Sequence, residues 1–510
     1  MLKRFKRTVA AALACLCLLT ALPVSASAAT RFTDVPAGHW AAASITRAAE
    51  LGLVNGRKDG SFGLGQTMTR AAFVTTLCRL FQWDMVSHAT GSFPDNQDPS
   101  KWYYSAVETA CVRGAVTQQE ANFRPGDAIT RQEMAVMLVR ALGYGTLASL
   151  AGERKSPFTD VSSSLGYLIL ANDLGVMTGN TRGQFLPDKT ATREQAAAVL
   201  VRVYDKLHAA APEICGVANS AEGLTLDGVN AAAIPAMKLI FNGGLQLVAD
   251  RPAEDVAAIR AVVGERPQLM QVSGTANGFT AANAEGLAEK ISTAAKDGGW
   301  DGVLLDVSKL RTAEKTAYTA LTQELRRLLG ADSLLYVSAE APTWNGKTTY
   351  TGYDFSALAV HADKVILRVA AYNQLVSGFP TAPQEPLEEL YYALAATAEL
   401  IPAEKRAFWL TSAGTVWKGD SAQSDLTAAQ VAELLNTSGV TDYWSTRYAA
   451  PYLSYTQSVT RMVVWYNTAR SAQARAQLTS FFGGGSFCIS DLSGPLAGEN
   501  GILTGLKTQG

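Results

Sequence analysis

The sequence predicts a multi-domain protein in which an α-helical array of three repeats is followed by one α/β domain with the architecture of a (β/α)8 barrel. The first observation is a Thr-Arg pair that recurs at intervals of 61 and 62 residues, at Thr69-Arg70, Thr130-Arg131 and Thr192-Arg193. The second is that short apolar runs alternate with helix-forming stretches from Leu224 onward, which is typical of a parallel sheet with crossover helices. The roughly 290 residues of this second part suit a single barrel.

The first 28 residues have the pattern of a secretory signal peptide. Basic residues near the start precede an apolar run from Val9 to Val24, and a small-residue cleavage pattern follows at Ala26-Ser27-Ala28. No later stretch has the roughly 18 uncharged apolar residues that a membrane-spanning helix needs. We therefore expect a secreted protein with no transmembrane segment.

Composition excludes several classes of function. The chain has 44 Lys and Arg against 45 Asp and Glu, and the leader carries some of the basic residues, so the mature protein is mildly acidic and should not bind nucleic acid. Its histidines and its cysteines outside the leader show no metal-ligand spacing, so we expect no metal and no cofactor. Cys215 and Cys488 lie near the two ends of the expected barrel, and the sequence is compatible with either buried free thiols or a bridge between them.

The repeats occupy residues 30–84, 91–145 and 156–208, and a linker at 209–222 leads to the barrel at 223–510. Each repeat begins with an aromatic residue and, two positions later, an aspartate (Asp34, Asp95 and Asp160). An amphipathic helix that ends at a glycine comes next, and a second helix follows the Thr-Arg pair. Two-helix units this short cannot bury their apolar faces alone, so they must pack on one another.

The threonine of the Thr-Arg pair has a structural explanation, whereas the arginine does not. Thr130 with Glu133 predicts a capping box, with the threonine as N-cap and the glutamate at the third helical position. The arginine opposes the helix macrodipole, and yet it recurs three times. A helix start with free N–H groups beside a guanidinium is a ready site for a carboxylate or phosphate. The repetition therefore predicts anion binding.

The repeats resemble surface-layer homology (SLH) domains in Trp40-Ala41, Asp59-Gly60-x-Phe62, Phe123-Arg-Pro125, Gly183-x-Phe185-x-Pro187 and the Thr-Arg starts. The resemblance implies binding to a secondary cell-wall polymer, often a pyruvylated one, and a location at the cell surface in the wall or S-layer. It also implies grooves lined by Asp34, Trp40, Arg70, Asp95, Trp102, Arg131, Asp160 and Arg193. Because the third repeat has no tryptophan, we expect its groove, with Arg193, to be the weakest.

Seven barrel strands are predicted from apolar runs: Lys238–Phe241, Gln268–Val272, Val303–Asp306, Leu334–Ser338, Lys364–Val369, Arg406–Leu410 and Phe487–Ile489. Helices are expected between them, at Ala282–Lys296, Ala313–Leu329 and Leu387–Leu400. Periodicity alone does not exclude a doubly wound sheet.

Several motifs of the second part resemble family 18 glycoside hydrolases and their spore-cortex relatives, whose signature is Asp-Gly-aliphatic-Asp-aliphatic-Asp-x-Glu. Asp301, Gly302, Val303 and Asp306 match this signature, whereas Leu304 stands at its middle Asp and Ser308 at its catalytic Glu. Further likenesses are Tyr353-Asp354-Phe355, Tyr372 near the tyrosine of the sixth strand, and an inserted β-hairpin around Leu453–Tyr466. The resemblance implies a (β/α)8 barrel that takes an N-acetylated glycan.

The missing glutamate decides the expected function. Enzymes of this family are the substrate-assisted exception among retaining glycosidases, so the protein itself supplies one general acid and an aspartate that orients the acetamide. A serine hydroxyl is too weak an acid near pH 7 to replace the glutamate. The leading interpretation is therefore a non-catalytic, glycan-binding barrel anchored at the cell surface.

Two features of the sequence bear on whether activity is retained without this glutamate. Glu340, which follows the next strand, would form a carboxylate pair with Asp306, and this gives the competing interpretation of an active wall or chitin-type hydrolase. A nucleophilic Ser308 is discounted, because no His or Lys is evidently placed to activate it. Under either interpretation, aromatic residues are available to stack on sugars: Trp344, Tyr372, Trp409 and Trp417.

Overall fold

The computed structural model describes residues 32–118, 121–242, 244–275, 278–344, 350–371, 381–419, 421–498 and 501–508. The expected signal peptide, residues 1–28, lies outside the described residues. The chain forms two compact units. We call the first, up to Gly143 together with Phe185–Val203, the repeat unit, and the second, Tyr144–Gln184 together with Tyr204–Gly510, the barrel unit. The third repeat is therefore divided between the two units.

The repeat unit is helical, as predicted. Its helices are α2 (Ala42–Glu50), α3 (Arg70–Leu80), α4 (Tyr104–Val112), α5 (Arg131–Ala141) and most of α8 (Arg193–Leu207). The Thr69 side chain caps α3 by accepting a hydrogen bond from the Ala72 N–H at 3.2 Å. The predicted capping box of Thr130 and Glu133 is present at the start of α5.

Three short segments that precede the second helices pair with one another around the centre of this unit. Isolated antiparallel bridges join Thr67 to Thr192, Thr69 to Ala128, and Thr130 to Thr190. Beside them, Phe62, Phe123 and Phe185 are completely buried. The three repeats therefore close on each other through main-chain pairing as well as through packed aromatic rings.

The barrel unit contains a closed parallel barrel, which excludes the doubly wound sheet. Eight parallel strands form it: β1 (Ile214–Val217), β2 (Ala231–Phe241), β4 (Gln268–Thr275), β5 (Gly302–Ser308), β6 (Leu334–Glu340), β7 (Lys364–Arg368), β8 (Arg406–Leu410) and β14 (Ser486–Ile489). Pairing of β1 with both β14 and β2 closes the ring. Because β1 is the first strand, the barrel begins inside the stretch expected to be a linker. A further strand, β3 (Leu245–Ala249), pairs antiparallel with β2.

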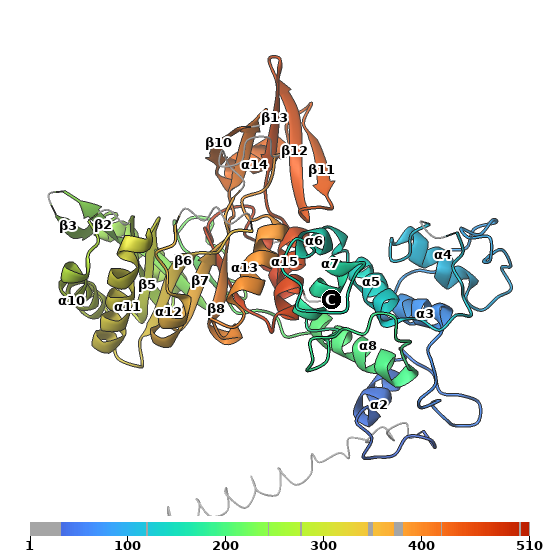
Figure 1. Ribbon diagram of the computed structural model, residues 1–510. Helices are drawn as coiled ribbons and strands as arrows, with labels where there is room; N and C mark the ends of the chain where they lie inside the picture. The colour runs from blue at the N-terminus through green and yellow to red at the C-terminus, as the bar shows by residue number, and fades with distance from the viewer. Residues whose placement is uncertain are drawn as a thin grey trace, which may run out of the picture. The chain divides into compact units, whose positions relative to one another are not determined.

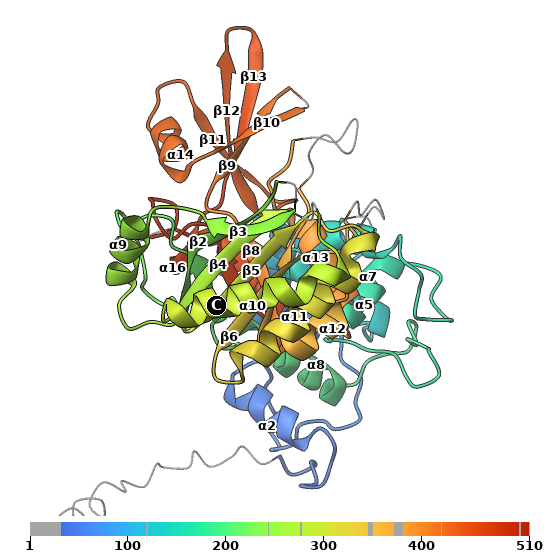
Figure 2. The ribbon, with the colours of Figure 1, turned by 90° about the vertical axis from the view of Figure 1, so that its left-hand side faces the viewer.

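Helices cover the outside of the barrel (Figures 1 and 2). They are α9 (Ala253–Val263), α10 (Ala281–Asp297), α11 (Lys315–Leu329), α12 (Phe355–His361), α13 (Leu387–Thr397), α15 (Ala469–Phe481) and α16 (Ile502–Lys507). Inside the barrel, alternate residues of the strands form a buried apolar cluster that includes Leu304, Tyr336 and Ile366. Cys215 and Cys488 belong to this cluster on adjacent strands, and both are free thiols.

A second, antiparallel sheet is inserted between β8 and α15. It consists of β9 (Gly414–Lys418), β10 (Ser421–Leu426), β11 (Thr441–Ser445), β12 (Ala450–Gln457) and β13 (Thr460–Trp465), in the order β10-β9-β13-β12-β11. The expected hairpin is β12–β13, but it is part of this larger sheet. Helix α14 (Ala428–Leu435) packs on one face through Val431, against Leu453 and Val464. The sheet projects from one end of the barrel (Figures 1 and 2).

The first half of the third repeat packs against the barrel within the same unit. It contributes α6 (Gly145–Ala151) and α7 (Leu165–Asp173). The Tyr391 hydroxyl of α13 donates a hydrogen bond to Asp173 at 2.7 Å, and Asp173 also forms an ion pair with Arg154. The ring of Tyr144 lies edge-on to Phe481 of α15, with centroids 6.2 Å apart.

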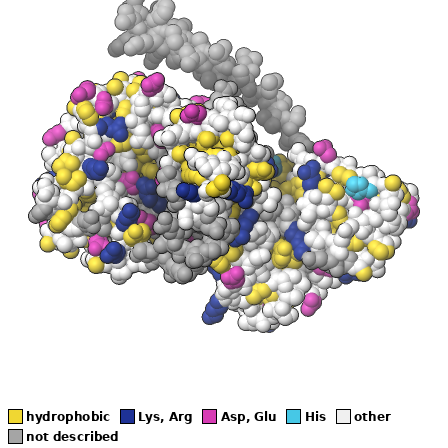
Figure 3. Space-filling view, turned by 90° about the horizontal axis from the view of Figure 1, so that it is seen from above, with side chains coloured by type: hydrophobic (Ala, Val, Ile, Leu, Met, Phe, Trp, Pro, Cys, Tyr) yellow, Lys and Arg dark blue, Asp and Glu magenta, His cyan; other side chains and the backbone are white. Residues whose placement is uncertain are grey.

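Charged side chains of both signs are scattered over the face of the molecule seen in Figure 3, in line with the near-neutral composition.

Candidate functional site

The interior of the barrel becomes polar toward the carboxyl ends of its strands. Side chains two residues apart on a strand share a face, so Leu304, Asp306 and Ser308 of β5 all point inward. Asp306 is only 8% exposed. Its carboxylate accepts hydrogen bonds from the Gln271 side-chain amide at 2.9 Å and from the Ser338 hydroxyl at 2.8 Å.

Arg368, the last residue of β7, completes the surroundings of Asp306. One terminal nitrogen of its guanidinium lies 2.7 and 2.8 Å from the two carboxylate oxygens. The guanidinium carbon lies 3.7 Å from the centre of the Trp409 ring. Each carboxylate oxygen thus accepts two hydrogen bonds, which uses all of its lone-pair positions. Asp306 is consequently a neutralised and hydrogen-bonded group, with no oxygen left to orient a substrate acetamide.

The other two residues of the altered motif lie in different places. Asp301 precedes β5, about 16 Å along the strand from Asp306. There its carboxylate accepts the Gln268 N–H at 2.8 Å, so it fastens the opposite end of the barrel. Ser308 ends β5 at the mouth, where its hydroxyl lies 3.4 Å from the Gly274 carbonyl oxygen. The structure therefore brings Asp306 and Ser308 to one end and leaves Asp301 at the other.

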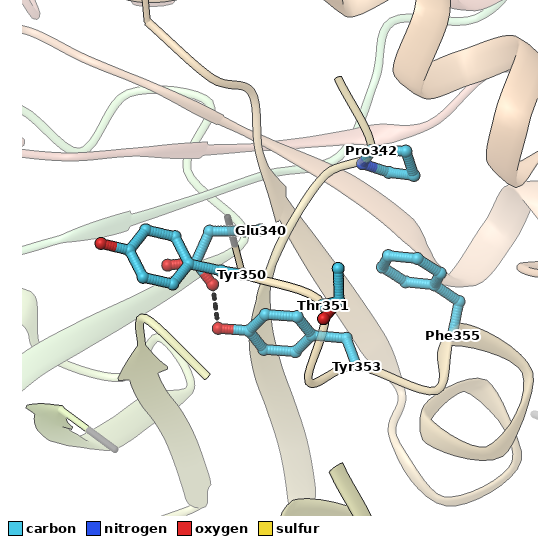
Figure 4. A pocket seen from close by; sticks show the side chains of 6 residues that line it. All are labelled: Glu340, Pro342, Tyr350, Thr351, Tyr353 and Phe355. Atoms are coloured by element: carbon cyan, nitrogen blue, oxygen red, sulfur yellow. Dashed lines mark hydrogen bonds between the residues drawn. The ribbon is translucent and has the colours of Figure 1, made fainter. Parts of the chain in front are cut away.

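Glu340 ends β6 at the same mouth. Its carboxylate accepts the Lys309 N–H at 2.8 Å and a hydrogen bond from the Tyr353 hydroxyl (Figure 4). Burial raises the pKa of Glu340, and the Lys309 N–H and Arg368 oppose this only in part. Lys309 itself has a φ of 63°, a left-handed conformation that a residue other than glycine rarely adopts. Glu340 therefore holds a strained turn in place as well as facing the mouth.

A pocket of about 180 Å³ adjoins Glu340 (Figure 4). The other residues around it are Pro342, Tyr350, Thr351, Tyr353 and Phe355. A pocket with aromatic walls and one carboxyl group of raised pKa has the composition of a ligand site.

The four aromatic residues considered as sugar platforms have different surroundings. Trp409 is partly buried beneath Arg368. Trp417 is 2% exposed and donates its indole N–H to the Ala382 carbonyl, so it is part of a core. The main-chain N–H of Trp344 donates to Glu389 at 2.9 Å. Tyr372 lies outside the described residues.

In the repeat unit, the aspartates that open the repeats hold loops. The Asp34 carboxylate accepts the N–H groups of Phe62, Gly63 and Leu64 at 2.6–2.8 Å. Burial raises the pKa of Asp34, but these three hydrogen bonds outweigh it and the pKa is lowered overall. Asp95 accepts the main-chain N–H groups of Phe123 and Arg124 in the same way.

The third opening aspartate, Asp160, belongs to the barrel unit, where it is half-buried. The two tryptophans that follow the first two aspartates are exposed. Trp40 is 64% and Trp102 65% exposed, a state in which large apolar rings can meet a ligand.

The three arginines form a cycle that the sequence did not reveal. The Nε atom of each donates to the carbonyl of a phenylalanine in the next repeat: Arg70 to Phe123, Arg131 to Phe185 and Arg193 to Phe62, at 2.7–2.9 Å. Each guanidinium also lies 4.9–5.1 Å from the centre of that phenylalanine ring. The arginines therefore have a structural role, since they join successive repeats, and the sequence alone did not indicate it.

This cycle changes which residues share a groove. Arg193 lies beside the first repeat, which has Trp40, whereas Arg131 reaches the third repeat, which has no tryptophan. Arg193 thus belongs to the third repeat in sequence but contacts the first repeat in the structure. The expectation that its groove is the weakest stays a prediction. These contacts could not be predicted from one repeat, because each joins residues of two different repeats.

The arginines also differ in charge balance. Arg70 is 2% exposed and forms an ion pair of 2.6 Å with Glu133. Arg193 is half-exposed, and burial followed by the nearby cation of Arg57 lowers its pKa, although Asp34 and Glu194 partly compensate. A cation beside another cation is better suited to receive an anion than a buried arginine that already has a carboxylate.

Two family models match the chain. The model for glycosyl hydrolases family 18 matches residues 254–485, and that for the S-layer homology domain matches residues 31–74, 97–135 and 157–197. The chain thus carries three SLH repeats and a family 18 glycosyl hydrolase domain, which confirms the two resemblances. SLH domains bind cell-wall polymers, so the protein is secreted and attached to the wall at the cell surface. Within the described part of the chain, no helix is long and apolar enough to span a bilayer.

Curated relatives match part of the chain. S-layer protein EA1 of Bacillus anthracis is 28% identical over 51% of this chain and 30% of its own length. Exoglucanase XynX of Acetivibrio thermocellus is 31% identical over 34% of this chain and 16% of its own. This chain thus spans less than a third of the length of these curated relatives. Among solved structures, a chitinase of Chromobacterium violaceum is 20% identical, with a TM-score of 0.49 over 58% of this chain and all of that one.

Proposed function

We propose that this protein is a wall-anchored, non-hydrolytic glycan-binding protein. Its SLH repeats hold a secondary cell-wall polymer, and its barrel holds an N-acetylated glycan without cleaving it. The observation that carries the proposal is the state of Asp306, which the guanidinium of Arg368 neutralises inside the barrel. Family 18 chemistry needs an aspartate free to orient the substrate acetamide beside a general acid. Here the aspartate is fully occupied, and Ser308 stands where the acid would be.

The rate acceleration that a general acid normally supplies is large, so its loss should leave little or no turnover. A positioned general acid contributes roughly 10²–10⁴-fold to the rate. A Ser308 hydroxyl cannot supply this proton near neutral pH. Restoring a glutamate at position 308 alone should recover little, because the paired Asp306 would still be unable to act and such groups work as a unit.

The likeness of the repeats to S-layer proteins supports the anchoring half of the proposal. The anion would sit at the helix starts, and a polymer bearing pyruvate ketals would supply the carboxylates. Arg193 with Arg57 is the arrangement best suited to such a group, and it lies in contact with Phe62 of the repeat that also carries Trp40.

One observation favours a second candidate, an active hydrolase. Glu340 combines a raised pKa with a place in the mouth pocket, which are two properties of a general acid. Its hydrogen bonds to Lys309 and Tyr353 give it a structural role as well. With Asp306 held by Arg368, Glu340 would have to work without a second free carboxylate, which weakens this candidate.

The deciding experiment measures reducing-end release from chitin oligomers and from isolated sacculi by the purified full-length chain. We expect no release above background, and no gain in Ser308→Glu. Retention of chitin oligomers by the same preparation, weakened in Trp409→Ala, would support glycan binding at the mouth. Robust turnover by the wild type that disappears in Glu340→Gln or Asp306→Asn would instead establish the hydrolase.

A further inference from the structure

The face of the inserted sheet that is turned away from α14 carries a row of aromatic rings. Tyr443 of β11 stacks on Tyr452 of β12 with centroids 5.2 Å apart, and Tyr452 lies 4.7 Å from Trp465 of β13. The row crosses three neighbouring strands, since Tyr443 pairs with Tyr452 and Tyr452 pairs with Trp465. Tyr443 is 46% exposed, so the outer end of the row faces solvent.

An open pocket of about 430 Å³ lies against this row. Arg447 and Arg461 contribute to its wall beside Trp444, Tyr452 and Trp465, and no Asp or Glu is among the described residues of the lining. The pocket is therefore cationic at its surface and aromatic at its floor. We call this combination of row and pocket the insert face.

The two arginines differ in how far they are already paired. Arg447 binds the buried carboxylate of Glu388 through two nitrogens and lies over the ring of Tyr448. Arg461 is exposed, and in the described part of the chain its guanidinium is hydrogen-bonded only to the Ser454 hydroxyl, at 3.3 Å. Arg461 therefore brings a positive charge to the pocket that no described carboxylate balances.

Trp465 adds a donor to the pocket. It is 5% exposed, and its indole N–H has no hydrogen-bond acceptor among the described residues. A buried donor without an acceptor is costly, and a hydroxyl or carboxylate of a ligand would relieve that cost.

We propose that the insert face binds an acidic saccharide, a pyranose ring that carries a carboxylate. The apolar face of the ring packs on Tyr452 and Trp465, and the carboxylate pairs with Arg461. Flat aromatic rings offer large apolar contact area, and an arginine binds a carboxylate through two parallel hydrogen bonds. A neutral chitin chain would use the rings but would leave the guanidinium unpaired, which is why the charge favours an acidic sugar.

The residues that line this pocket differ from those of the pocket beside Glu340, and the proposal does not depend on whether the barrel hydrolyses glycans. The insert face would give the protein a second contact to wall glycan, one that recognises charge. Because charge-assisted contacts at an exposed site are screened by salt, the affinity should fall as ionic strength rises.

The test is isothermal titration calorimetry on the full-length chain with two matched probes. N-acetylglucosaminyl-N-acetylmuramic acid carries a lactyl carboxylate, and chitobiose is its neutral counterpart. We expect the acidic disaccharide to bind at least about tenfold tighter at low salt. Arg461→Met should remove this preference, while Arg327→Met, at an exposed position on α11 beside Glu324, should leave it intact.

The substitution Trp465→Phe keeps an aromatic ring at this position but removes the indole N–H donor. It should weaken both probes severalfold, because the donor is lost and the stacking surface shrinks, and circular dichroism would verify that the sheet is intact. Equal affinity for the two probes, or an acidic preference that persists in Arg461→Met, would overturn the proposal.

Discussion

Both compact units bury arginine side chains against aromatic rings, but the arginines have different partners. In the repeat unit, Arg193 is anchored by Nε to the main-chain carbonyl of Phe62, which does not cancel its charge. In the barrel unit, Arg368 lies over Trp409 and pairs with the one carboxylate that the altered motif retains. A motif residue that is retained in the sequence can therefore be held by an uncharged group, as Arg193 is, or be neutralised by a charged neighbour, as Asp306 is.

The largest expected effect concerns the ion pair of Asp306 and Arg368 in the barrel. Arg368→Met leaves the Asp306 carboxylate buried without its counter-charge, which should lower the free energy of unfolding of the barrel unit by about 3–5 kcal/mol. The double variant Asp306→Asn/Arg368→Met should recover most of that loss, because it removes both charges. Urea denaturation followed by tryptophan fluorescence measures both changes.

Arg327→Met is the matched control, since Arg327 forms an exposed ion pair with Glu324 on α11. Exposed pairs contribute little to stability, so its unfolding curve should match that of the wild type. If Arg368→Met unfolded like this control, the interpretation of Asp306 as a neutralised, buried group would be wrong.

Much of the barrel could be predicted because its strands are apolar runs between turns. Arg406–Leu410 is β8 as predicted. Each other predicted strand lies inside an observed strand, except that the one starting at Lys364 extends one residue past β7. Several observed strands are longer than predicted. The first strand was missed because Ile214–Val217 has only four residues and lies next to polar sequence. Most of the inserted sheet was missed because β10 and β11 are rich in polar residues and β11 is mostly exposed, so neither has the apolar pattern of a buried strand.

The site was less predictable than the fold. The sequence identified Asp306, Ser308 and Glu340 from one motif and its neighbouring strand, and the structure places all three at one end of the barrel. It did not identify Arg368, because an arginine that ends a strand looks the same whether it faces solvent or a carboxylate inside. For the same reason the cyclic contacts of the three repeat arginines needed the structure, since each contact joins residues 53 or more positions apart.

The stability of the two units should depend on pH in different ways. Burial raises the pKa of Glu385 in the barrel unit to about 7, against the lowering effects of Arg475, the Thr411 N–H and Asn467. In the unfolded chain this carboxyl ionises near its ordinary pKa, so the unfolded state loses its proton first. The stability that Glu385 contributes is present below about pH 4.5 and is lost as the pH rises to 7, by roughly 3 kcal/mol.

The repeat unit should behave in the opposite sense. Burial raises the pKa of Glu133, but the Thr130 N–H, Arg70 and Arg124 outweigh burial, and the pKa is lowered overall. Its stabilising contribution is present above the unfolded pKa and is lost only as the pH falls below it. Hydrogen exchange of peptides from each unit at pH 5 and pH 8, corrected for the intrinsic rate, should show weaker protection at pH 8 in the barrel unit alone. Glu385→Gln should remove most of that difference and leave the smaller part that comes from Glu340, whose pKa burial also raises. An undiminished difference in this variant would contradict the role of Glu385.

The smallest effect tests which groove of the repeats binds the wall. Arg193 retains a cationic surrounding beside the first repeat, whereas Arg70 is buried with Glu133. Arg193→Ala should therefore weaken co-sedimentation with isolated sacculi about tenfold, or about 1.4 kcal/mol, with little change in the unfolding curve. Arg70→Met should do the reverse, because it leaves Glu133 without its buried partner, so it should lower the unfolding midpoint more than it lowers wall affinity per folded molecule. Arg131→Ala, beside the repeat that has no tryptophan, should fall between the two in binding. Equal loss of sedimentation in all three folded variants would show that the arginines act through the closure of the repeats and not through contact with the polymer.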